Sequence, residues 1–566
     1  MKKSISLVLT GAAGQGIQIF EEISVKMFKK EGFNVFATKK YMSRVRGGIN
    51  STEIRISSVN KPRAYCNNID ILIPFKVEGY EKNKKRLTKN SYILIDKSFK
   101  EEIKEDSGNF LYIPFNKMSK EAGGNIYTNT IAVGVLSGIL NLNIESAKNI
   151  ISKKFKNKAK KIIDNNLEAF KIGFEEGKKY NLKFNLKLEK LKKGKDIVLN
   201  GSESIALGAI AGGCNFVSAY PMSPSTEVLQ ICASMAEDFG IVVEQIEDEI
   251  SAVNMSIGAW FAGARGLITT SGGGFALMSE GLSLAGMIES PLVIHLAQRP
   301  GPATGLPTRT EQGDLNLAVY SGHGEFPRIV LAPGTIEEGF DLTQKAFNLA
   351  DKYQVPVMIL TDQYFVSSYY NLKIPEFDKI ENKKYFIKSK EDYKRHEITK
   401  NGLSKRAIPG FGKGIVKTTG NEHEENGFIT EDMNIRNSMQ EKRLCKLELL
   451  KEKMIEPTFY GNKNAEFLFL SWGSTFNIIK EAFEKLNSKN VALLHFSQVY
   501  PLSKNIYKYF NNSKQCYVVE NNSTSQFRKL LRTELNLNID GSILKYDGRP
   551  FSAEGIYSKI KKIING

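Results

Sequence analysis

The sequence predicts an α/β protein that is built from several doubly wound domains. Short apolar segments with the composition of buried strands alternate with helical patterns, an order that is typical of parallel βαβ units. The chain has 566 residues, whereas a single hydrophobic core stops growing near about 250–300 residues. Several domains are therefore expected.

Changes in composition along the chain suggest where these domains begin and end. A lysine-rich stretch, NLKFNLKLEKLKKGKD, has no apolar periodicity and is expected to be a linker. A long polar segment with several glycines separates two later α/β regions. The expected division is a first domain at 1–180, the linker at 181–196, a second domain at 197–370, an irregular connecting segment at 371–463 and a small α/β domain at 464–566.

The first domain opens with a strand, Ser4–Leu9, and an amphipathic helix, Ile17–Lys30. The glycine-rich turn between them, GAAGQG, contains Gly11, Gly14, Gln15 and Gly16. Such a turn can present backbone N–H groups to a phosphate, but the spacing equally fits a plain tight turn. Further strands are expected at Asn34–Ala37, Glu53–Ser57, Ile69–Pro74, Tyr92–Asp96 and Phe110–Ile113.

Two arginines, Arg44 and Arg46, stand beside the pair Gly47-Gly48 in the segment KYMSRVRGGIN. Guanidinium groups next to glycines suit an anionic ligand, and they suit a contact with another subunit equally well.

The second domain begins with the helix Ser202–Ala211 and the strand Phe216–Tyr220. Next comes YPMSPST, in which Ser223 lies between two prolines at a strand-to-helix corner. Its hydroxyl either faces a ligand or only caps the following helix. The domain is expected to close with strand Ile329–Leu331, helix Ile336–Ala350 and strand Val357–Leu360.

The segment from Ile241 to Asp314 is the expected active region. A short apolar strand ends in the acids Glu244, Glu247, Asp248 and Glu249, and a helix follows. In parallel sheets, ligands bind beyond the carboxyl ends of the strands. A carboxylate, a glycine turn and a guanidinium are each expected just past such an end. The order is Glu249, strand Leu267–Thr270, glycines Gly272–Gly274, a helix over about Ala276–Ile288, strand Leu292–Ala297 and then Arg299.

The last two regions of the sequence say less about function. The connecting segment contains AIPGFGKG and TTGNEHEENGFITED and is expected to end in a basic helix, Asn434–Met454. The final domain alternates strands and helices again. Its expected elements are strand Glu466–Leu470, helix Phe476–Leu486, strand Val491–His495, a further helix, strand Gln515–Val519 and helix Ser525–Leu535.

The formal net charge of +18 raises the question of nucleic-acid binding. Residues 151–200 account for half of it, with 15 lysines and 6 acids, whereas residues 241–300 have 6 acids and 2 arginines. Lysines on one helix and a linker favour a solvated face over a nucleic-acid site, which would combine arginines with stacking aromatics. No apolar run reaches the ~20 residues of a membrane span, and the apolar start is too short for a signal peptide. A cytoplasmic protein is expected.

The cysteines and histidines predict no metal centre in this chain. The five cysteines are dispersed without a C-x-x-C pair, so neither zinc nor a cysteine-bound cluster is supported. His423 has no second histidine at a ligand spacing. His295 lies in the middle of a strand and is expected to be a core residue.

The segments YPMSPST, EDEISAVNMSIGA, TTSGGGFALMSEGLSLAGM and QRPGPATGLPTRTEQGDL resemble the α subunit of the 2-oxoacid:ferredoxin oxidoreductases. GAAGQG and YMSRVRGGINSTEIRIS resemble their γ subunit, so the chain is similar to the fused γ–α form. RAIPGFGKG, GNEHEENGFITED, SWGST, VVENN and KYDGRPF extend the likeness towards the C-terminus. The resemblance implies a pyrimidine-binding domain for thiamine diphosphate and a transketolase C-terminal-like domain.

In this family a 2-oxoacid is decarboxylated and oxidised to an acyl-CoA, and ferredoxin accepts the electrons. The resemblance implies that Glu249 is the carboxylate that contacts the pyrimidine of thiamine diphosphate. It also implies that Arg299 binds the substrate carboxylate. The other residues carried over are Ser223 and Thr304 for the substrate, and Tyr220, Pro221, Gly272 and Gly273 for the cofactor.

The sequence departs from the family pattern at two places. Ala13 stands where the family commonly has glycine, which weakens ligand contact at GAAGQG. The Gly-Asp-Gly motif for the diphosphate and magnesium is absent, since Gly313-Asp314 lacks the second glycine. The family therefore implies a heterodimer whose β subunit holds Mg²⁺ and a [4Fe-4S] cluster, with coenzyme A, ferredoxin and a 2-oxoacid as further partners in anaerobic metabolism.

Two alternatives differ from this interpretation. One is a thiamine-dependent enzyme that does not use ferredoxin, against which the γ-like first third argues. The other is a non-catalytic subunit that binds CoA or a nucleotide, against which the presence of both Glu249 and Arg299 argues. PGPATGLPT and SRVRGG resemble the 2-oxoglutarate type more than the type for pyruvate, and branched-chain acids remain open.

Overall fold

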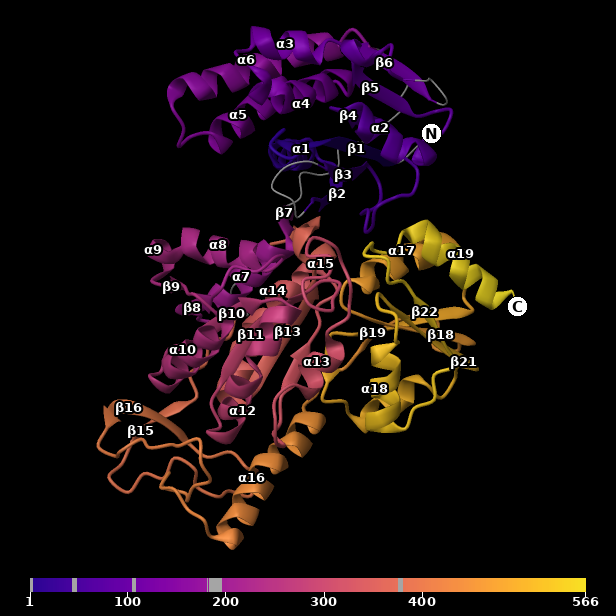
Figure 1. Cartoon of the computed structure of the whole chain (residues 1–566). Coiled ribbons are helices and arrows are strands. Elements are labelled where there is room, and N and C mark those ends of the chain that lie inside the picture. Colours follow the sequence, from indigo (N-terminus) through magenta and orange to yellow (C-terminus); the bar gives the residue numbers. More distant parts are fainter. Residues whose placement is uncertain are drawn as a thin grey trace. The chain divides into compact units, whose positions relative to one another are not determined.

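The computed structural model describes residues 4–42, 48–103, 108–180, 182, 196–374 and 380–565. The chain divides into two compact units, each drawn in Figure 1. Unit 1 combines residues 1–199 with the short segments 367–374 and 552–555. Unit 2 comprises residues 200–366, 375–551 and 556–566. The predicted linker lies outside the described residues, apart from Leu182 and Asp196.

Unit 1 is organised around one sheet with the strand order β6-β5-β4-β1-β3-β2-β14-β7. β1 pairs in parallel with β4 but antiparallel with β3, and β2 is antiparallel to both β3 and β14. This half of the sheet is therefore antiparallel, whereas β1, β4, β5 and β6 pair in parallel. The strands are β1 (Ser4–Ala12), β2 (Asn34–Lys40), β3 (Ile49–Ser57), β4 (Ile71–Pro74), β5 (Tyr92–Asp96), β6 (Asn109–Ile113), β7 (Asp196–Asn200) and β14 (Tyr369–Lys373).

Strand β14 corrects a predicted boundary. Residues from 371 onward were expected to belong to an irregular connecting segment, yet Tyr369 and Tyr370 pair with Ala37 and Phe36 of β2. Asn371 Oδ1 also accepts a hydrogen bond of 2.7 Å from the backbone N–H of Val35. This pairing joins residues more than 300 positions apart, so no local pattern could reveal it.

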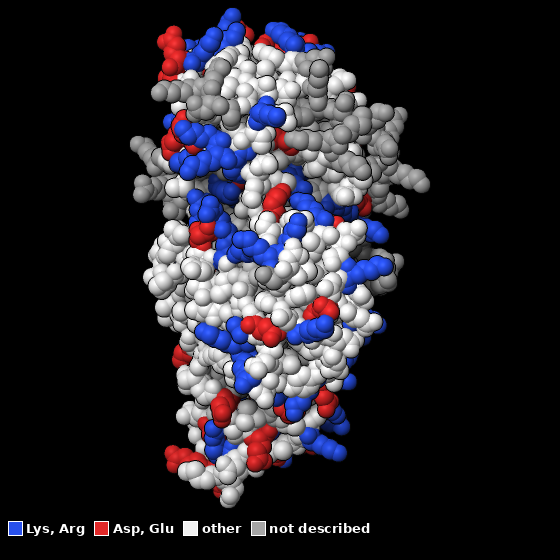
Figure 2. Space-filling model, turned by 90° about the vertical axis from the view of Figure 1, so that its right-hand side faces the viewer, with Lys and Arg blue, Asp and Glu red and all other residues white. Residues whose placement is uncertain are grey.

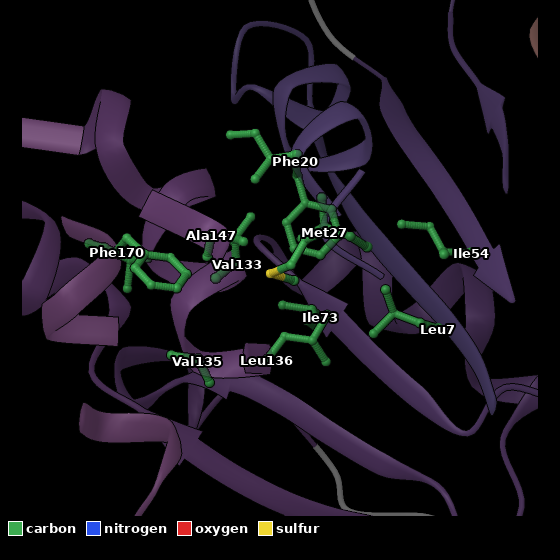
Figure 3. Close-up of a cluster of buried hydrophobic side chains, with 14 of the residues drawn as sticks. Leu7, Phe20, Met27, Ile54, Ile73, Val133, Val135, Leu136, Ala147 and Phe170 are labelled. Atoms are coloured by element: carbon green, nitrogen blue, oxygen red, sulfur yellow. The ribbon is translucent and has the colours of Figure 1, made fainter. Parts of the chain in front are cut away.

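The helices of unit 1 pack on the sheet around a core of aliphatic and aromatic side chains, part of which Figure 3 shows. α4 and α6 approach each other backbone to backbone, because glycines stand where the two helices touch. A side-chain carbon on Gly134 would lie 2.2 Å from the carbonyl oxygen of Phe170, and one on Gly177 would lie 2.2 Å from that of Val135. The helices are α1 (Ile17–Lys30), α2 (Val77–Asn83), α3 (Phe115–Glu121), α4 (Thr128–Ile139), α5 (Ile144–Lys154) and α6 (Lys160–Gly177).

Unit 2 contains the sheet that organises the candidate site. Its strand order is β20-β12-β13-β11-β10-β8-β9, and every pairing is parallel except that of β20 with β12. The expected parallel βαβ arrangement is confirmed here. The strands are β8 (Phe216–Ala219), β9 (Val242–Gln245), β10 (Gly266–Thr270), β11 (Leu292–Gln298), β12 (Ile329–Leu331), β13 (Pro356–Asp362) and β20 (Gln498–Tyr500).

The helices between these strands follow the predicted order with one correction. Gly272–Gly274 were expected to form a turn before a single helix, but they form the first turn of α11 (Gly272–Leu277). A second helix, α12 (Ser279–Met287), follows at once. The remaining helices are α7 (Gly201–Ala211), α8 (Thr226–Ser234), α9 (Ala236–Phe239), α10 (Glu249–Phe261), α13 (Leu315–Tyr320), α14 (Ile336–Tyr353) and α15 (Gln363–Ser367).

The connecting segment has small structure of its own. β15 (Phe386–Ser389) pairs with β16 (Arg406–Gly412), and the basic helix α16 (Met433–Glu452) follows. The buried side chains of α16 include Lys442 and Lys446, both of which pair with the buried carboxylate of Glu289. His396 Nδ1 lies 3.3 Å from the same carboxylate. A buried ion cluster thus attaches a charged helix to the sheet domain, since each buried charge needs a partner.

The last part of unit 2 is a sheet with the order β17-β19-β18-β21-β22. β17 (Thr458–Gly461) is antiparallel to β19 and was not predicted. The other pairings are parallel, as the alternating pattern indicates. The elements are β18 (Phe467–Trp472), α17 (Thr475–Leu486), β19 (Val491–Phe496), β21 (Gln515–Glu520), α18 (Gln526–Leu535), β22 (Gly541–Leu544) and α19 (Ala553–Ile564).

The distribution of charge and the helix composition bear on the expectations from composition. On the face drawn in Figure 2, described lysines and arginines are interspersed with acidic and uncharged side chains. Within the described ranges, no helix is both long and apolar enough to cross a membrane. His295, expected in a core, is completely buried between Thr269 and Thr361, and burial lowers its pKa to about 3.

Candidate functional site

The predicted site residues of unit 2 follow neighbouring strands of one parallel sheet. Tyr220 and Pro221 come directly after β8, Gly272 comes two residues after β10, and Arg299 directly follows β11. β8, β10 and β11 are adjacent and parallel, so their carboxyl ends share one edge. Side chains from three separate segments of the chain can therefore meet at this edge, as the sequence predicts.

Glu249 is the first residue of α10 and is only 3% exposed. The preceding residue, Asp248, caps the helix, since its side chain accepts a hydrogen bond of 2.6 Å from the backbone N–H of Ser251. Capping by Asp248 leaves the Glu249 carboxylate free of that role, and Glu249 Oε1 has no hydrogen-bond partner among the described residues. A buried carboxylate oxygen without a partner is costly, so it indicates a position for a ligand.

The three glycines of α11 have different surroundings. A side-chain carbon on Gly274 would lie 2.5 Å from Glu249 Oε1 and 2.2 Å from Thr270 Oγ1. One on Gly272 would lie 2.5 Å from Asp314 Oδ2. Gly273 is exposed, and a side chain there would meet nothing within 4 Å. Gly272 and Gly274 therefore make room for protein carboxylates, whereas Gly273 leaves an open face that a ligand could approach.

Arg299 is connected to the YPMSPST corner. Its Nη1 donates a hydrogen bond of 2.7 Å to the backbone carbonyl of Ser223. The contact uses the carbonyl and leaves the Ser223 hydroxyl for other partners. α8 begins at Thr226 with Ser225 at its N-cap position, so the alternative in which Ser223 caps this helix is wrong. Thr304 lies in the exposed loop 301–306, five residues after Arg299.

Two further carboxylates lie close to this edge and were not proposed from the sequence. Asp314 precedes α13, and burial raises the pKa of its carboxyl to about 6 although the charge of Arg299 lowers it. Burial and the charge of Asp314 raise the pKa of Glu311 to about 7. The sequence signal was the spacing in EQGD, which places both acids in one short loop after Arg299. The sequence did not show that these two carboxyl groups are partly buried.

The GAAGQG segment of unit 1 borders a separate cavity. Gln15 Oε1 accepts a hydrogen bond of 2.7 Å from the N–H of Ala12, which closes the turn between β1 and α1. Gly16 has a φ of 72° and contacts Asn129, where a side chain would collide. A cavity of about 200 Å³ opens beside Gly14 and Gln15. Its lining includes Phe75, Phe99 and Phe115.

The structure describes some of the other residues predicted around this segment and not others. Gly11 is the eighth residue of β1, and a side chain there would meet Gln15 Oε1 at 2.7 Å. Arg44, Arg46 and Gly47 lie outside the described residues. Among the residues that are described, no group of three or more His, Cys, Asp or Glu side chains could hold a metal ion.

Comparisons with known proteins agree along the whole chain. A family described as pyruvate flavodoxin/ferredoxin oxidoreductase, thiamine diphosphate-binding, matches residues 207–442. A second, described as pyruvate ferredoxin/flavodoxin oxidoreductase, matches residues 6–176. The 2-oxoacid:ferredoxin oxidoreductase subunit alpha of Sulfolobus sp is 31% identical, over 99% of this chain and 97% of its own length.

Two more specific relatives are informative. The 2-oxoglutarate synthase subunit KorA of Methanothermobacter thermautotrophicus is 38% identical over 44% of this chain and 65% of its own length. The solved structure of 2-oxoglutarate:ferredoxin oxidoreductase from Magnetococcus marinus, with 2-oxoglutarate, coenzyme A and succinyl-CoA bound, is 29% identical. It has a TM-score of 0.91 and covers 100% of both chains.

Proposed function

Because the chain belongs to the 2-oxoacid:ferredoxin oxidoreductase family, as an alpha subunit, we propose that it decarboxylates and oxidises 2-oxoglutarate with coenzyme A as acyl acceptor. The single observation that supports the catalytic assignment is the buried Glu249 carboxylate, whose Oε1 lacks a partner among the described residues and lies against Gly274, next to the open Gly273. Pyruvate and branched-chain 2-oxoacids are the alternative substrates. The proposed domains are the γ-like 1–180, the pyrimidine-binding 197–370 and the transketolase C-terminal-like 464–566.

The residues of this edge fit the pyrimidine of thiamine diphosphate. A buried carboxylate oxygen without a partner can hydrogen-bond a ring nitrogen, and the exposed Gly273 lets a flat ring approach the backbone. Tyr220, 38% exposed, and Pro221 supply apolar surface at the end of β8. When bound, thiamine diphosphate supplies the nucleophilic carbon and the electron sink that decarboxylation of a 2-oxoacid requires.

Each proposed residue has a distinct task. Glu249 holds a proton at the pyrimidine nitrogen, which sets the tautomer of the ring. Arg299 pairs with the carboxylate of the 2-oxoacid, while its Nη1 bond to the carbonyl of Ser223 fixes the direction of the guanidinium. The hydroxyl of Ser223 and that of Thr304 are proposed to hydrogen-bond the substrate.

The diphosphate, the metal and the iron-sulfur cluster are proposed to lie on a β subunit. A diphosphate is held through Mg²⁺, which needs hard oxygen ligands, and the described residues offer no such group. The five cysteines are free, and burial raises the pKa of the Cys214 thiol well above its ordinary value and that of Cys232 to about 12. Protonated thiols do not bind iron well. Ferredoxin would then receive electrons from the β subunit.

The cavity beside Gly14 and Gln15 is proposed to accept part of coenzyme A. Three phenylalanines can contact a flat base, and Gly14 leaves the turn open beside the cavity, since a side chain there would meet nothing within 4 Å. The alternative is a subunit contact. Replacing Gln15 with Ala should raise the KM for coenzyme A and leave that for the 2-oxoacid unchanged.

The substrate assignment is tested with the chain assembled with its β subunit. The rate of ferredoxin reduction would be measured with 2-oxoglutarate, pyruvate and a branched-chain 2-oxoacid at saturating coenzyme A. We expect the highest kcat/KM for 2-oxoglutarate, since the 2-oxoglutarate enzyme from Magnetococcus marinus shares the fold over the whole chain. A tenfold advantage of another acid would contradict the substrate, and no activity with any 2-oxoacid would contradict the function.

A further inference from the structure

Three segments in the last part of unit 2, SWGST, VVENN and KYDGRPF, have no task in the reaction proposed above. They cover residues 471–475, 518–522 and 545–551. In the structure, each segment contributes a residue that is hydrogen-bonded to the loop from Arg299 to Asp314, called the Arg299 loop below. The Arg299 loop therefore joins the proposed substrate site to the last part of unit 2.

Gln312 makes the central contacts of this junction. Its side chain donates a hydrogen bond of 2.9 Å to the carbonyl of Trp472 and accepts one of 2.8 Å from the N–H of Asn521. Its backbone N–H donates to the carbonyl of Asn521 at 2.7 Å, and its carbonyl accepts a bond of 3.1 Å from Nδ2 of Asn522. Gly473 makes room for this side chain, because a side-chain carbon there would lie 2.9 Å from Gln312 Nε2. Gln312 is completely buried, so loss of these bonds would leave polar groups unsatisfied.

The side chain of Gln312 occupies the place at which a parallel sheet usually binds a ligand. β18 ends at Trp472 and the adjacent parallel strand β21 ends at Glu520. The chain passes from β18 to β19 on one side and later to β21 on the other, so the direction of strand addition reverses at β18. Ligands bind beyond the carboxyl ends of the strands at such a point. Here Gln312 bonds to the groups at both strand ends.

The anion position of the same edge is also filled from within the chain. Glu520 is completely buried, and its carboxylate accepts hydrogen bonds from the N–H groups of Phe527 at 2.9 Å and Arg528 at 3.2 Å. These groups belong to the first turn of α18, where an anionic ligand would otherwise bind. The last part of unit 2 thus holds a protein loop where a sheet of this kind usually holds a ligand.

Further contacts hold the Arg299 loop on both sides of Gln312. Gln526 Nε2 donates to the carbonyl of Gly313 at 2.7 Å. The backbone N–H of Thr310 donates to the carbonyl of Gly548 at 3.2 Å. The end of the loop is therefore attached at several successive residues and not through one bond alone.

The part of the loop that Gln312 holds is joined to Arg299. The backbone N–H of Asp314 donates a hydrogen bond of 2.9 Å to Gln298 Oε1, which closes the base of the loop. Arg299 directly follows Gln298, and its Nη1 donates to the carbonyl of Ser223 at 2.7 Å. A displacement at Gln312, two residues before Asp314, would therefore reach the backbone beside Arg299 through one hydrogen bond.

We propose that Gln312 is a positioning residue, through which the last part of unit 2 fixes the loop that carries Arg299 and Thr304 to the 2-oxoacid. This inference rests on the proposed pairing of Arg299 with the substrate carboxylate. Glu249 belongs to α10, and none of the bonds of Gln312 involves that helix. Gln312 therefore acts on the binding of the 2-oxoacid more than on the chemical step, so its loss should change KM more than kcat.

The kinetic test compares Gln312→Ala with the unmodified chain, each assembled with the β subunit. We expect the KM for 2-oxoglutarate to rise about tenfold, with kcat changed by less than about twofold and the KM for coenzyme A unchanged. Gln526→Ala removes the bond to Gly313 and keeps Gln312, so it should change the same KM in the same direction by less. Gln526→Ala also supplies the test if Gln312→Ala does not fold.

Proteolysis of the full chain measures the position of the loop independently of activity. Trypsin cleaves after arginine, and Arg309 lies in the Arg299 loop between the buried residues Thr308 and Thr310. Cleavage there requires the loop to open locally, so Gln312→Ala should be cut after Arg309 about fivefold faster or more. The products would be identified by mass spectrometry. An unchanged cleavage rate in Gln312→Ala would overturn the proposal.

Asn477→Ala is the matched control. Asn477 also joins the last part of unit 2 to the other parallel sheet, since its Nδ2 donates to the carbonyl of Gly334 at 3.1 Å, but Gly334 lies outside the Arg299 loop. The variant should lower the melting temperature and leave both the KM for 2-oxoglutarate and the cleavage after Arg309 unchanged. A rise in that KM as large as in Gln312→Ala would show general loosening of the junction and would overturn the proposal.

One comparison separates this inference from the proposed function. If the unmodified complex has no activity with any 2-oxoacid, the proposed function is wrong. If Arg299→Ala leaves every KM for a 2-oxoacid unchanged, the pairing of Arg299 with the substrate is wrong and the inference fails with it. If Arg299→Ala raises these KM values while Gln312→Ala and Gln526→Ala do not, only the role of Gln312 is wrong.

Discussion

Replacing Glu249 with Gln is the most direct test of the catalytic assignment. Glutamine has nearly the same shape, so the packing of a side chain that is 3% exposed should be preserved. Glu249 Oε1 has no hydrogen-bond partner among the described residues, so the substitution breaks no bond of that atom. We expect the free energy of unfolding to change by less than about 1 kcal/mol, because burying an amide costs less than burying a carboxylate.

The rate should change much more than the stability. A positioned acid or base contributes about 10²–10⁴-fold to a rate, so we expect kcat to fall by about 10²-fold or more. A factor of 10² corresponds to about 2.7 kcal/mol of transition-state stabilisation. The fall would be measured as ferredoxin reduction by the assembled complex at saturating 2-oxoacid and coenzyme A, with thermal unfolding recorded on the same samples.

The neighbouring acid provides a matched control with the opposite outcome. Asp248 caps α10 through the N–H of Ser251, so Asp248→Ala should lower the melting temperature slightly with kcat nearly unchanged. A Glu249→Gln enzyme that keeps half of its activity would refute the assignment of Glu249. So would a Glu249→Gln protein that loses stability in proportion to its loss of rate.

Three further predictions concern the candidate site and the division of cofactors between the subunits. Arg299→Ala should raise the KM for the 2-oxoacid at least tenfold more than that for coenzyme A, since a charge-assisted pair away from water is costly to break. Equal increases in the two KM values would show that Arg299 does not bind the 2-oxoacid. Gly274→Ala should lower the melting temperature, because its methyl group would lie 2.2 Å from Thr270 Oγ1. Gly273→Ala should fold normally and bind thiamine diphosphate more weakly in calorimetry. A destabilised Gly273→Ala protein beside a stable Gly274→Ala protein would contradict the open face at Gly273. The chain purified alone should contain no stoichiometric iron or sulfide by metal analysis and should be inactive, and iron with activity in the isolated chain would show that the division between subunits is wrong.

Local sequence pattern was a good guide to individual elements. The helix Ile17–Lys30 and the strands Tyr92–Asp96 and Ile329–Leu331 have the predicted bounds. Their apolar residues recur with the period of the element, and turn residues flank them. The pattern failed at Gly272–Gly274, where three glycines suggested a turn but form the start of α11. Close contacts with Glu249 and Asp314, and not backbone freedom, explain two of these glycines.

The sequence by itself also predicted the sheet edge at which the candidate site lies. In a parallel sheet, residues that follow different strands must meet at the carboxyl edge, so Glu249, Gly272 and Arg299 could be placed together without coordinates. That inference needs only the order of strands and helices, which local periodicity supplies.

Only the tertiary structure decided which polar groups are buried and paired across long separations. β14 joins the sheet of unit 1 through partners more than 300 residues away. Glu289 pairs with Lys442 and Lys446 of a helix about 150 residues later. Asp314 looked like an incomplete metal motif in the sequence, yet it packs on Gly272 with a pKa raised to about 6. Burial and Coulomb interactions depend on distances between chain segments, and a one-dimensional pattern does not contain those distances.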